Sequence, residues 1–233
     1  MQIPEGKVLI NTINAHSYNV AQKDEAFAES LNANDNLNHK KYLIPDGSSI
    51  VKACRWLKGK SLPKERIAGW DFFAFEMARL NESSNNHPCV MFMGSSEQVL
   101  EKMRERAAKD YPNLEVVTFS PPFKPEFTDE DNTAIIDAIN QANPDLLWIG
   151  MTAPKQEKWA WQHWSKLDIH CHVGTIGAVF DFYAGTAKRA PLWMQRHSLE
   201  WLYRLVKEPK RMWRRYIVGN PLFIYRIVKE KIK

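Results

Sequence analysis

The sequence predicts an α/β fold with a mostly parallel sheet, helices on both faces of that sheet, and a basic helical appendage at the C-terminus. Two observations predict the sheet: short apolar runs alternate with longer stretches of helical period, and polar turn residues follow several of the runs. A third observation predicts the appendage. Residues 187–233 hold 13 Lys or Arg against 3 Asp or Glu, whereas residues 1–186 hold 19 basic and 24 acidic residues.

The apolar runs define the expected strands, because a short continuous apolar run suits a strand that is buried on both faces. In chain order these strands are Val8–Ile10, Tyr42–Ile44, Cys89–Met93, Val116–Val117, Leu146–Ile149 and Ile169–Val173.

Helical periodicity defines the expected helices: Glu25–Leu31, Ile50–Leu57, Phe72–Leu80, Glu97–Asp110, Asp131–Gln141 and Lys155–Lys166. The last of these also has a start signal in Pro154 and Glu157, since proline fits the first turn and an acid complements the helix dipole. Strands that alternate with helices in this way form a Rossmann-like sheet covered on both faces.

The tail has a different pattern. Its helix-period segments are split by Pro209 and Pro221, and proline stops or kinks helices. We therefore expect an α/β core over residues 1–186 and an appendage of short amphipathic helices over residues 187–233.

Composition limits the compartment and the class of protein. A chain of 233 residues can hold one sizeable domain plus an appendage. The three cysteines are widely spaced and odd in number, so a disulfide framework is not expected and a reducing cytoplasm fits best. No apolar run reaches the roughly 18–20 residues of a spanning helix, and the N-terminus does not resemble a signal peptide.

Polar clusters follow several expected strands at their carboxyl ends. They are Thr12 with Asn14, Asp46 with Gly47, Gly94-Ser95-Ser96, and the segment Thr152 to Glu157. Ligands of open α/β sheets bind outside the carboxyl ends of the strands. The sequence therefore predicts a ligand site at this edge.

Two of these clusters suit a phosphorylated ligand. Gly94 and Ser95 lie between a strand and a helix, where backbone N–H groups attract phosphate, although a plain strand-to-helix turn explains them equally well. In the other cluster, Lys155 could meet a phosphate and Gln156 could hydrogen-bond a sugar or a base. Glu157 is explained by the helix start.

Asp46 is the candidate general base. It lies between Pro45 and Gly47 at a strand end, where its carboxylate could accept a proton from a hydroxyl nucleophile. The alternative is a common Pro-Asp-Gly turn.

Two sequence patterns could indicate a metal site. Asp129-Glu130-Asp131 matches a D-x-D cation motif, but acids there also suit a helix start. His163, His170 and His172 could join Cys171 around zinc, but Cys171 points to the opposite strand face from its two histidine neighbours. We therefore expect neither a metal nor a cofactor.

The tail presents three arginines, Arg204, Arg211 and Arg214, at spacings that one helical face could share. Such a face suits a diphosphate or anionic lipid headgroups, although a solvated basic helix is the alternative. The interleaved aromatics favour an anionic membrane surface. Nucleic acid is a second anionic partner, but the acidic body and the apolar tail argue against it.

Several blocks of sequence resemble one family. They are Gly150–Trp159 (GMTAPKQEKW), Phe180–Pro191 (FDFYAGTAKRAP), Leu199–Arg204 (LEWLYR), Pro45–Gly47 (PDG), Arg66–Gly69 (RIAG) with Asp71, and Val218–Pro221 (VGNP). Together they resemble the WecG/TagA/CpsF glycosyltransferases over nearly the whole chain.

The resemblance implies an inverting, metal-independent transferase. It would move N-acetylmannosamine, its uronic acid or a related hexose from a UDP donor onto a sugar linked to undecaprenyl diphosphate, for cell-surface polysaccharide synthesis. It also implies self-association and a peripheral location on the inner face of the plasma membrane. The alternative that stays open is a non-catalytic UDP-sugar-binding module.

The resemblance also assigns site residues. It implies that Asp46 is the base and that Thr12, Asn14 and Gln156 line the pocket. It also implies that Asp181 reaches the nucleoside and that Arg204, Arg211 and Arg214 close over the donor diphosphate. One departure is Pro121-Pro122-Phe123, which stands where relatives often carry Gly-Tyr-Phe and puts an aromatic stack on the base in question.

Overall fold

The computed structural model describes residues 5–32, 40–59, 62–84 and 87–232. It divides into two compact units. Unit 1 comprises Met1–Asn11, Glu29–Leu43 and Gly69–Ala187, and unit 2 comprises Thr12–Ala28, Ile44–Ala68 and Lys188–Lys233. The basic tail thus groups with two earlier segments of the chain.

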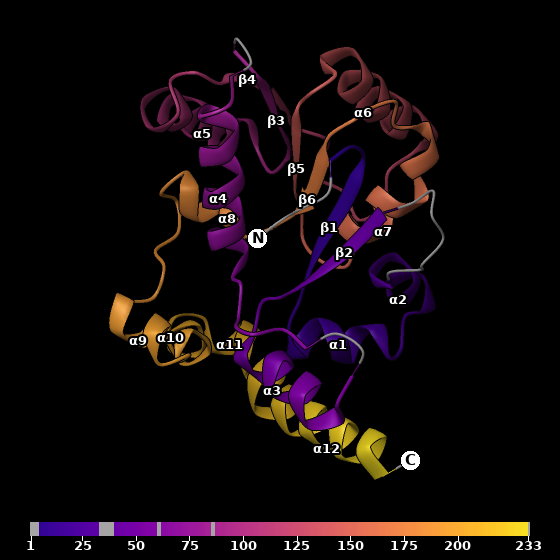
Figure 1. The fold of residues 1–233 in the computed structure, drawn as a ribbon, viewed down its shortest axis with the longest axis vertical. Coiled ribbons are helices and arrows are strands. Elements are labelled where there is room, and N and C mark those ends of the chain that lie inside the picture. Colours follow the sequence, from indigo (N-terminus) through magenta and orange to yellow (C-terminus); the bar gives the residue numbers. More distant parts are fainter. Residues whose placement is uncertain (1–4, 33–39, 60–61, 85–86, 233) are drawn as a thin grey trace. The chain divides into compact units, whose positions relative to one another are not determined.

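A six-stranded sheet forms the centre of unit 1 and has the order β2-β1-β6-β5-β3-β4 (Figure 1). The strands are β1 (Val8–Ile13), β2 (Lys40–Pro45), β3 (Cys89–Gly94), β4 (Glu115–Phe119), β5 (Leu146–Gly150) and β6 (His172–Thr175). The pairs β1–β6, β5–β6, β3–β5 and β3–β4 are parallel, which confirms the predicted sheet. The expected start of the last strand was wrong, because pairing begins at His172 and not at Ile169.

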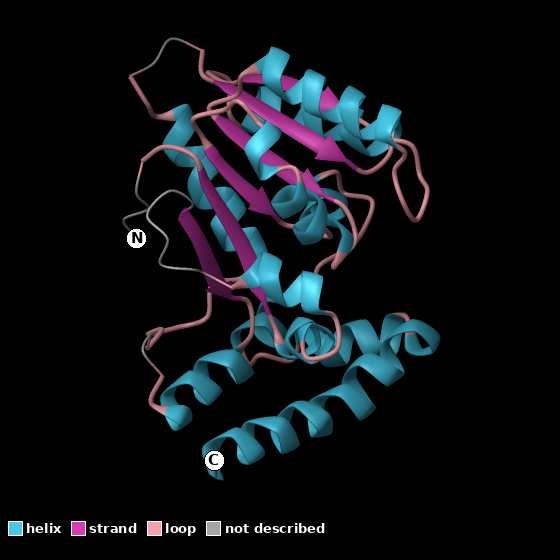
Figure 2. Ribbon diagram, turned by 90° about the vertical axis from the view of Figure 1, so that its right-hand side faces the viewer, coloured by secondary structure: helices cyan, strands magenta, loops and turns pink. Residues whose placement is uncertain are grey.

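Helices cover both faces of this sheet, as predicted (Figures 1 and 2). On one face, Met91, Leu147 and Val173 pack with apolar residues of α6 (Asp129–Ala142) and α7 (Lys155–Gln162). On the other face, Phe92 and Trp148 meet aromatic rings from α4 (Gly69–Asn81) and α8 (Val179–Tyr183). The two faces alternate residue by residue because successive strand side chains point in opposite directions.

One glycine permits the close packing of the second face. A Cβ atom on Gly174 would lie 2.2 Å from the ring of Trp148, which Phe72 meets edge-on at 5.0 Å between ring centroids. Any side chain at this position of β6 would therefore displace the indole ring from the core.

The remaining helices of the sheet region agree closely with expectation. Helix α2 spans Glu25–Leu31, α3 spans Ser48–Leu57 and α5 spans Glu97–Asp110. Helix α7 stops at Gln162, and a short 3-10 turn at Trp164–Lys166 completes the predicted segment. Helices α1 (Ala15–Ala21) and α8 were not predicted.

Unit 2 has its own small core. Helices α1, α3 and α12 (Gly219–Ile232) share it through Ala15, Ile50, Ala53, Phe223 and Ile227. The rings of Tyr18 and Phe223 meet edge-on at 5.3 Å between centroids. Polar contacts reinforce this packing, because the buried Asn19 Nδ2 donates to Gly219 O at 2.7 Å and Arg226 Nη1 donates to Asn19 O and Oδ1 at 2.9 and 3.0 Å.

The tail is more continuous than its prolines predict. After α9 (Leu192–Arg196) and α10 (Glu200–Lys207), α11 (Pro209–Trp213) runs through a π-helical turn at Arg214–Val218 directly into α12. Pro209 starts a helix, whereas the expected split at Pro221 was wrong. Proline lacks an N–H group and crowds the carbonyl four residues earlier, and the wider π turn just before Pro221 relieves that conflict.

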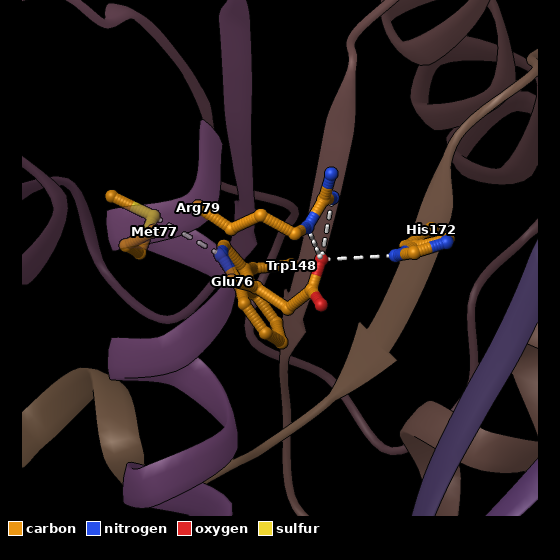
Figure 3. Close-up of polar contacts among 5 residues, drawn as sticks. All are labelled: Glu76, Met77, Arg79, Trp148 and His172. Atoms are coloured by element: carbon orange, nitrogen blue, oxygen red, sulfur yellow. Dashed lines mark hydrogen bonds and ion pairs between the residues drawn. The ribbon is translucent and has the colours of Figure 1, made fainter. Parts of the chain in front are cut away.

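A buried ionic cluster lies at the amino end of β6 (Figure 3). The Oε2 atom of Glu76, a fully buried residue, lies 2.9 Å from His172 Nδ1 and accepts from Arg79 Nη2 at 2.7 Å. Burial alone would raise the pKa of Glu76, but the hydrogen bonds and charges of His172 and Arg79 outweigh it and leave the pKa below its usual value. The ionised carboxylate therefore stabilises unit 1.

We expect Glu76→Gln to lower the free energy of unfolding by roughly 3 kcal/mol at neutral pH, because it removes the charged partner of a buried pair. A carboxyl with a lowered pKa contributes stability above its unfolded-state pKa, and the contribution is lost as the pH falls. The difference between variant and wild type should therefore shrink under acid conditions. Urea denaturation at several pH values checks this, with Glu101→Gln in the exposed Glu101–Arg104 pair as the control. Equal effects of the two substitutions would contradict the expectation.

We expect Asn19→Ala to loosen α12, since it removes a buried hydrogen bond to the Gly219 carbonyl and the contact with Arg226 Nη1. Hydrogen exchange should show faster exchange across Gly219–Ile232 by about tenfold, with little change in the sheet. Lys229→Ala, at an exposed site on the same helix, is the matched control. Unchanged protection of α12 in Asn19→Ala would show that the apolar contacts alone hold it.

Candidate active site

Three predicted site residues of unit 2 lie at neighbouring strand ends. Thr12 and Asn14 lie at the end of β1 and just beyond it, and Asp46 follows β2 directly. The Asp46 N–H group donates to Ile13 O at 2.9 Å, and a Cβ atom on Gly47 would lie 3.7 Å from the Cβ of Asn14. The two strand ends therefore present Asp46 beside Asn14, and Asp46 is half-buried at the start of α3.

Asn14 also begins α1. Its Oδ1 atom accepts from the N–H groups of His16 and Ser17 at 3.0 and 3.1 Å, and Ser17 Oγ accepts from the Asn14 N–H group at 2.8 Å. This reciprocal cap fixes the orientation of the Asn14 amide. No described residue accepts from its Nδ2 atom, so the amide can offer two donors to a ligand.

The tail arginines have different environments. Arg204 on α10 is half-buried, whereas Arg211 is exposed and pairs with Glu208 at 2.7 Å. Arg214 is also exposed, and its guanidinium carbon lies 5.3 Å from the ring centroid of Trp213.

Arg215 is a candidate that the sequence analysis missed. Its Nε atom is buried and has no hydrogen-bond acceptor among the described residues. Burial lowers the pKa of Arg215, Tyr216 and Asp46 raise it, and the positive charges of Arg204 and Arg211 lower it further. Arg215 therefore belongs to one electrostatic cluster with Asp46 and two predicted arginines.

His16 was missed as well. Burial, followed by the charge of Arg215, lowers the pKa of His16 to about 4. A neutral imidazole thus lies close to the Asp46 cluster at neutral pH. Signals for both residues existed: His16 follows Asn14 by two positions, and Arg215 lies four residues after Arg211, which is one helical turn.

The other predicted residues lie in unit 1. Gly94 and Ser95 end β3 with φ angles of +123° and +57°, and a Cβ atom on Gly94 would lie 2.5 Å from Gly150 O. Only glycine fits there. Helix α5 then starts after Ser96, which makes no side-chain capping bond. The backbone N–H groups in the first turn of α5 therefore donate no hydrogen bond to the Ser96 side chain.

Lys155 anchors a loop. Its Nζ atom donates to Lys124 O at 2.6 Å and lies 3.5 Å from the ring centroid of Phe127. Burial lowers its pKa. The ammonium group thus holds the segment between β4 and α6, in which Phe123 is fully exposed.

Gln156 and Glu157 are buried, with exposed fractions of 4% and 2%. Gln156 Oε1 accepts from the N–H groups of Met151 and Gly177, each at 3.1 Å, and its Nε2 atom donates to Glu157 Oε1 at 2.8 Å. Burial raises the pKa of Glu157 to about 7. These hydrogen bonds of Gln156 and Glu157 are therefore made to groups within the protein.

Asp181 is half-buried on α8. Its carbonyl accepts from the N–H groups of Thr186 and Ala187 at 3.0 and 3.1 Å, and its Oδ1 atom lies 3.4 Å from Thr186 Oγ1. This turn directs the segment that follows α8.

No group of three His, Cys, Asp or Glu side chains in the described part of the chain could hold a metal ion. Asp131 instead caps α6, where its Oδ2 atom accepts from Thr128 N at 2.7 Å, so the helix-start reading of the D-x-D motif is confirmed. His170 lies outside β6.

Across residues 5–32, 40–59, 62–84 and 87–232, no helix is both long and apolar enough to cross a bilayer.

Comparison with known proteins gives a consistent result. The chain is 27% identical over 223 residues to the N-acetylglucosaminyldiphosphoundecaprenol N-acetyl-beta-D-mannosaminyltransferase of Bacillus subtilis, covering 96% of this chain and 80% of that protein. The proteins with the same name from Staphylococcus aureus and Bacillus spizizenii are 28% and 30% identical, covering 97% and 84% of this chain and 82% and 71% of theirs.

The family model described as "Glycosyl transferase WecG/TagA/CpsF family" matches residues 2–233. The resemblance seen in the sequence blocks is thereby confirmed. The chain belongs to the WecG/TagA/CpsF family of glycosyltransferases.

Proposed function

We propose that this enzyme transfers N-acetylmannosamine, or its uronic acid, from a UDP donor to an N-acetylglucosamine linked to undecaprenyl diphosphate, with inversion at the anomeric carbon. The observation that carries the proposal is the cluster in unit 2, where Asp46 lies beside Asn14 and where Arg215 interacts electrostatically with Asp46, Arg204 and Arg211. The names of the relatives support the choice of sugar and acceptor.

Asp46 acts as the general base. Its carboxylate takes the proton of an acceptor hydroxyl while the hydroxyl oxygen attacks the anomeric carbon. The bond between that carbon and the UDP oxygen breaks, and UDP leaves with the electron pair. Because attack comes from the face opposite the leaving group, a single displacement inverts the configuration.

The arginines stabilise the negative charge that develops on the leaving diphosphate. Guanidinium groups are suited to this because they stay charged and bind phosphate oxygens in pairs. The Nε–H group of Arg215 lacks an acceptor among the described residues, so it is prepared to receive an oxygen atom. The expectations that the Gly94–Ser95 turn meets phosphate and that Asp181 meets the nucleoside stay part of this proposal.

The tail also supplies a surface for an anionic membrane. Large apolar side chains are exposed on it, namely Trp193, Trp201, Val206, Trp213, Ile217, Ile224, Tyr225 and Val228. Exposed basic residues lie among them, including Lys207, Lys210 and Lys229. Apolar and aromatic side chains enter the headgroup region while basic side chains meet anionic lipids. The enzyme would thus reach a lipid-linked acceptor without crossing the bilayer.

The proposal predicts a product. Incubation with UDP-N-acetylmannosamine and a short polyprenyl-diphosphate N-acetylglucosamine should raise the acceptor mass by one N-acetylhexosamine, as read by mass spectrometry. Donor binding by calorimetry without any transfer, across UDP-N-acetylmannosamine and its uronic acid, would favour a non-catalytic binding module instead.

Asp46→Asn should lower kcat at least about 100-fold, because the amide cannot accept the proton. Binding of UDP by calorimetry should stay within about threefold of wild type, since the carboxylate acts on the acceptor. Asp137→Asn, an exposed residue on α6, is the control. Turnover of Asp46→Asn at the wild-type rate would show that Asp46 is not the base.

Replacing Trp213 and Tyr225 by serine should weaken association with anionic vesicles by at least roughly tenfold in co-sedimentation, because burial of each aromatic ring favours binding by about 1.5 kcal/mol or more. Both side chains are exposed, so folding should be retained. Neutral vesicles and duplex DNA are the comparison ligands. Stronger binding to DNA than to anionic vesicles at matched salt would show that the partner of the tail is nucleic acid and not a membrane.

A further inference from the structure

The Gln156–Glu157 pair has a role that the proposed chemistry does not assign. Both residues lie in the first turn of α7, and both are almost completely buried. Polar side chains at the start of a helix are normally solvated, so two buried ones require partners within the protein.

The contacts of Gln156 fix the orientation of its amide. Its Oε1 atom accepts from two backbone N–H groups, those of Met151 and Gly177, each at 3.1 Å. Turning the amide over would place an NH2 group against two donors and lose both hydrogen bonds. The Nε2 atom must therefore point the other way, where it donates to Glu157 Oε1 at 2.8 Å.

These bonds join two segments at the carboxyl edge of the sheet. Met151 follows β5, and Gly177 follows β6 on the way to α8, which carries Asp181. Gly177 has a φ angle of +42°, and a Cβ atom there would lie 3.0 Å from Met151 O. The amide of Gln156 thus acts as a bridge between two closely packed turns.

Burying the carboxyl of Glu157 in this position costs free energy. Its Oε2 atom has no hydrogen-bond partner among the described residues. An acid in the first turn favours a helix even when it is exposed, so the helix start alone does not account for its burial. Among the described residues, its carboxyl interacts with the amide of Gln156 and with its own backbone.

We propose that Glu157 is a positioning residue: its carboxyl orients the Gln156 amide, and through that amide it holds the turn after β5 against the turn after β6. The structural part of this proposal stands without the proposed function. Its kinetic consequence rests on that function, because the second turn leads to Asp181, to which we assign the nucleoside.

The test compares two variants of the full chain. Glu157→Leu keeps the bulk of the side chain and removes the acceptor, whereas Glu157→Gln keeps an acceptor for Gln156 Nε2. Hydrogen exchange of the Met151 and Gly177 N–H groups, followed by NMR, is the first readout. We expect exchange about tenfold or more faster in Glu157→Leu, and within about threefold of wild type in Glu157→Gln. Glu130→Gln, at an exposed first-turn acid of α6, is the matched control.

Transfer kinetics give a second readout. In Glu157→Leu the KM for the UDP donor should rise about tenfold with a smaller change in kcat, and Glu157→Gln should restore most of the loss. A Glu157→Gln variant as impaired as Glu157→Leu would overturn the proposal in favour of a requirement for the carboxylate charge. Wild-type exchange in Glu157→Leu would overturn it outright.

The pH dependence keeps the proposal testable if Glu157→Leu fails to fold. The pKa of Glu157 is raised by burial to about 7, so its stability contribution is present in acid and lost as the pH rises towards and through 7. Protection of the Met151 and Gly177 N–H groups should fall over this range in wild type and stay level in Glu157→Gln. The same slope in both proteins would overturn the proposal. Absence of sugar transfer by wild type, with this exchange pattern intact, would reject only the proposed function.

Discussion

The docking of α12 on α1 and α3 is the interaction on which the proposed site depends. Helix α1 begins at Asn14 and α3 begins just after Asp46, so the helices that α12 holds are those that present these two residues. Burial of Phe223 and Ile227 contributes roughly 2–3 kcal/mol each, and the Asn19 contacts with Gly219 and Arg226 give the packing a defined register. The last helix of the basic tail is therefore built into the unit that carries Asp46, the proposed base.

This arrangement places basic residues of the tail and the Asp46 carboxylate in one unit. The Arg215 guanidinium interacts electrostatically with Asp46 and with two further arginines, Arg204 and Arg211, and we propose that this positive charge attracts a diphosphate to the same unit. His16 stays neutral beside them, since burial and Arg215 lower its pKa to about 4. On unit 1, Gly94 and Ser95 end β3 with positive φ angles, and the Gln156 amide joins the turns after β5 and β6.

Much of the fold could be predicted from periodicity, and the failures have physical causes. Buried strands such as Cys89–Gly94 and long helices such as Glu97–Asp110 have patterns that tertiary contacts do not alter. Helix α8 is too short to show a period, and the start of α1 depends on the Asn14 cap. Asp46 and Asn14 could be placed at strand ends because a parallel sheet aligns its carboxyl ends. Arg215 could not be preferred over Arg214, because the π turn and the packing of α12 decide which arginine is buried. The bridging role of Gln156 depends on Gly177, which lies 21 residues away in sequence.

We propose that a single displacement, assisted by Asp46, transfers the sugar. The stereochemistry of the product tests it most directly. With an α-linked UDP donor, NMR of the purified product should show a β-linkage, from the one-bond coupling between carbon and hydrogen at the anomeric centre. An α-linked product would mean retention of configuration, and it would contradict a mechanism with one base and no covalent intermediate.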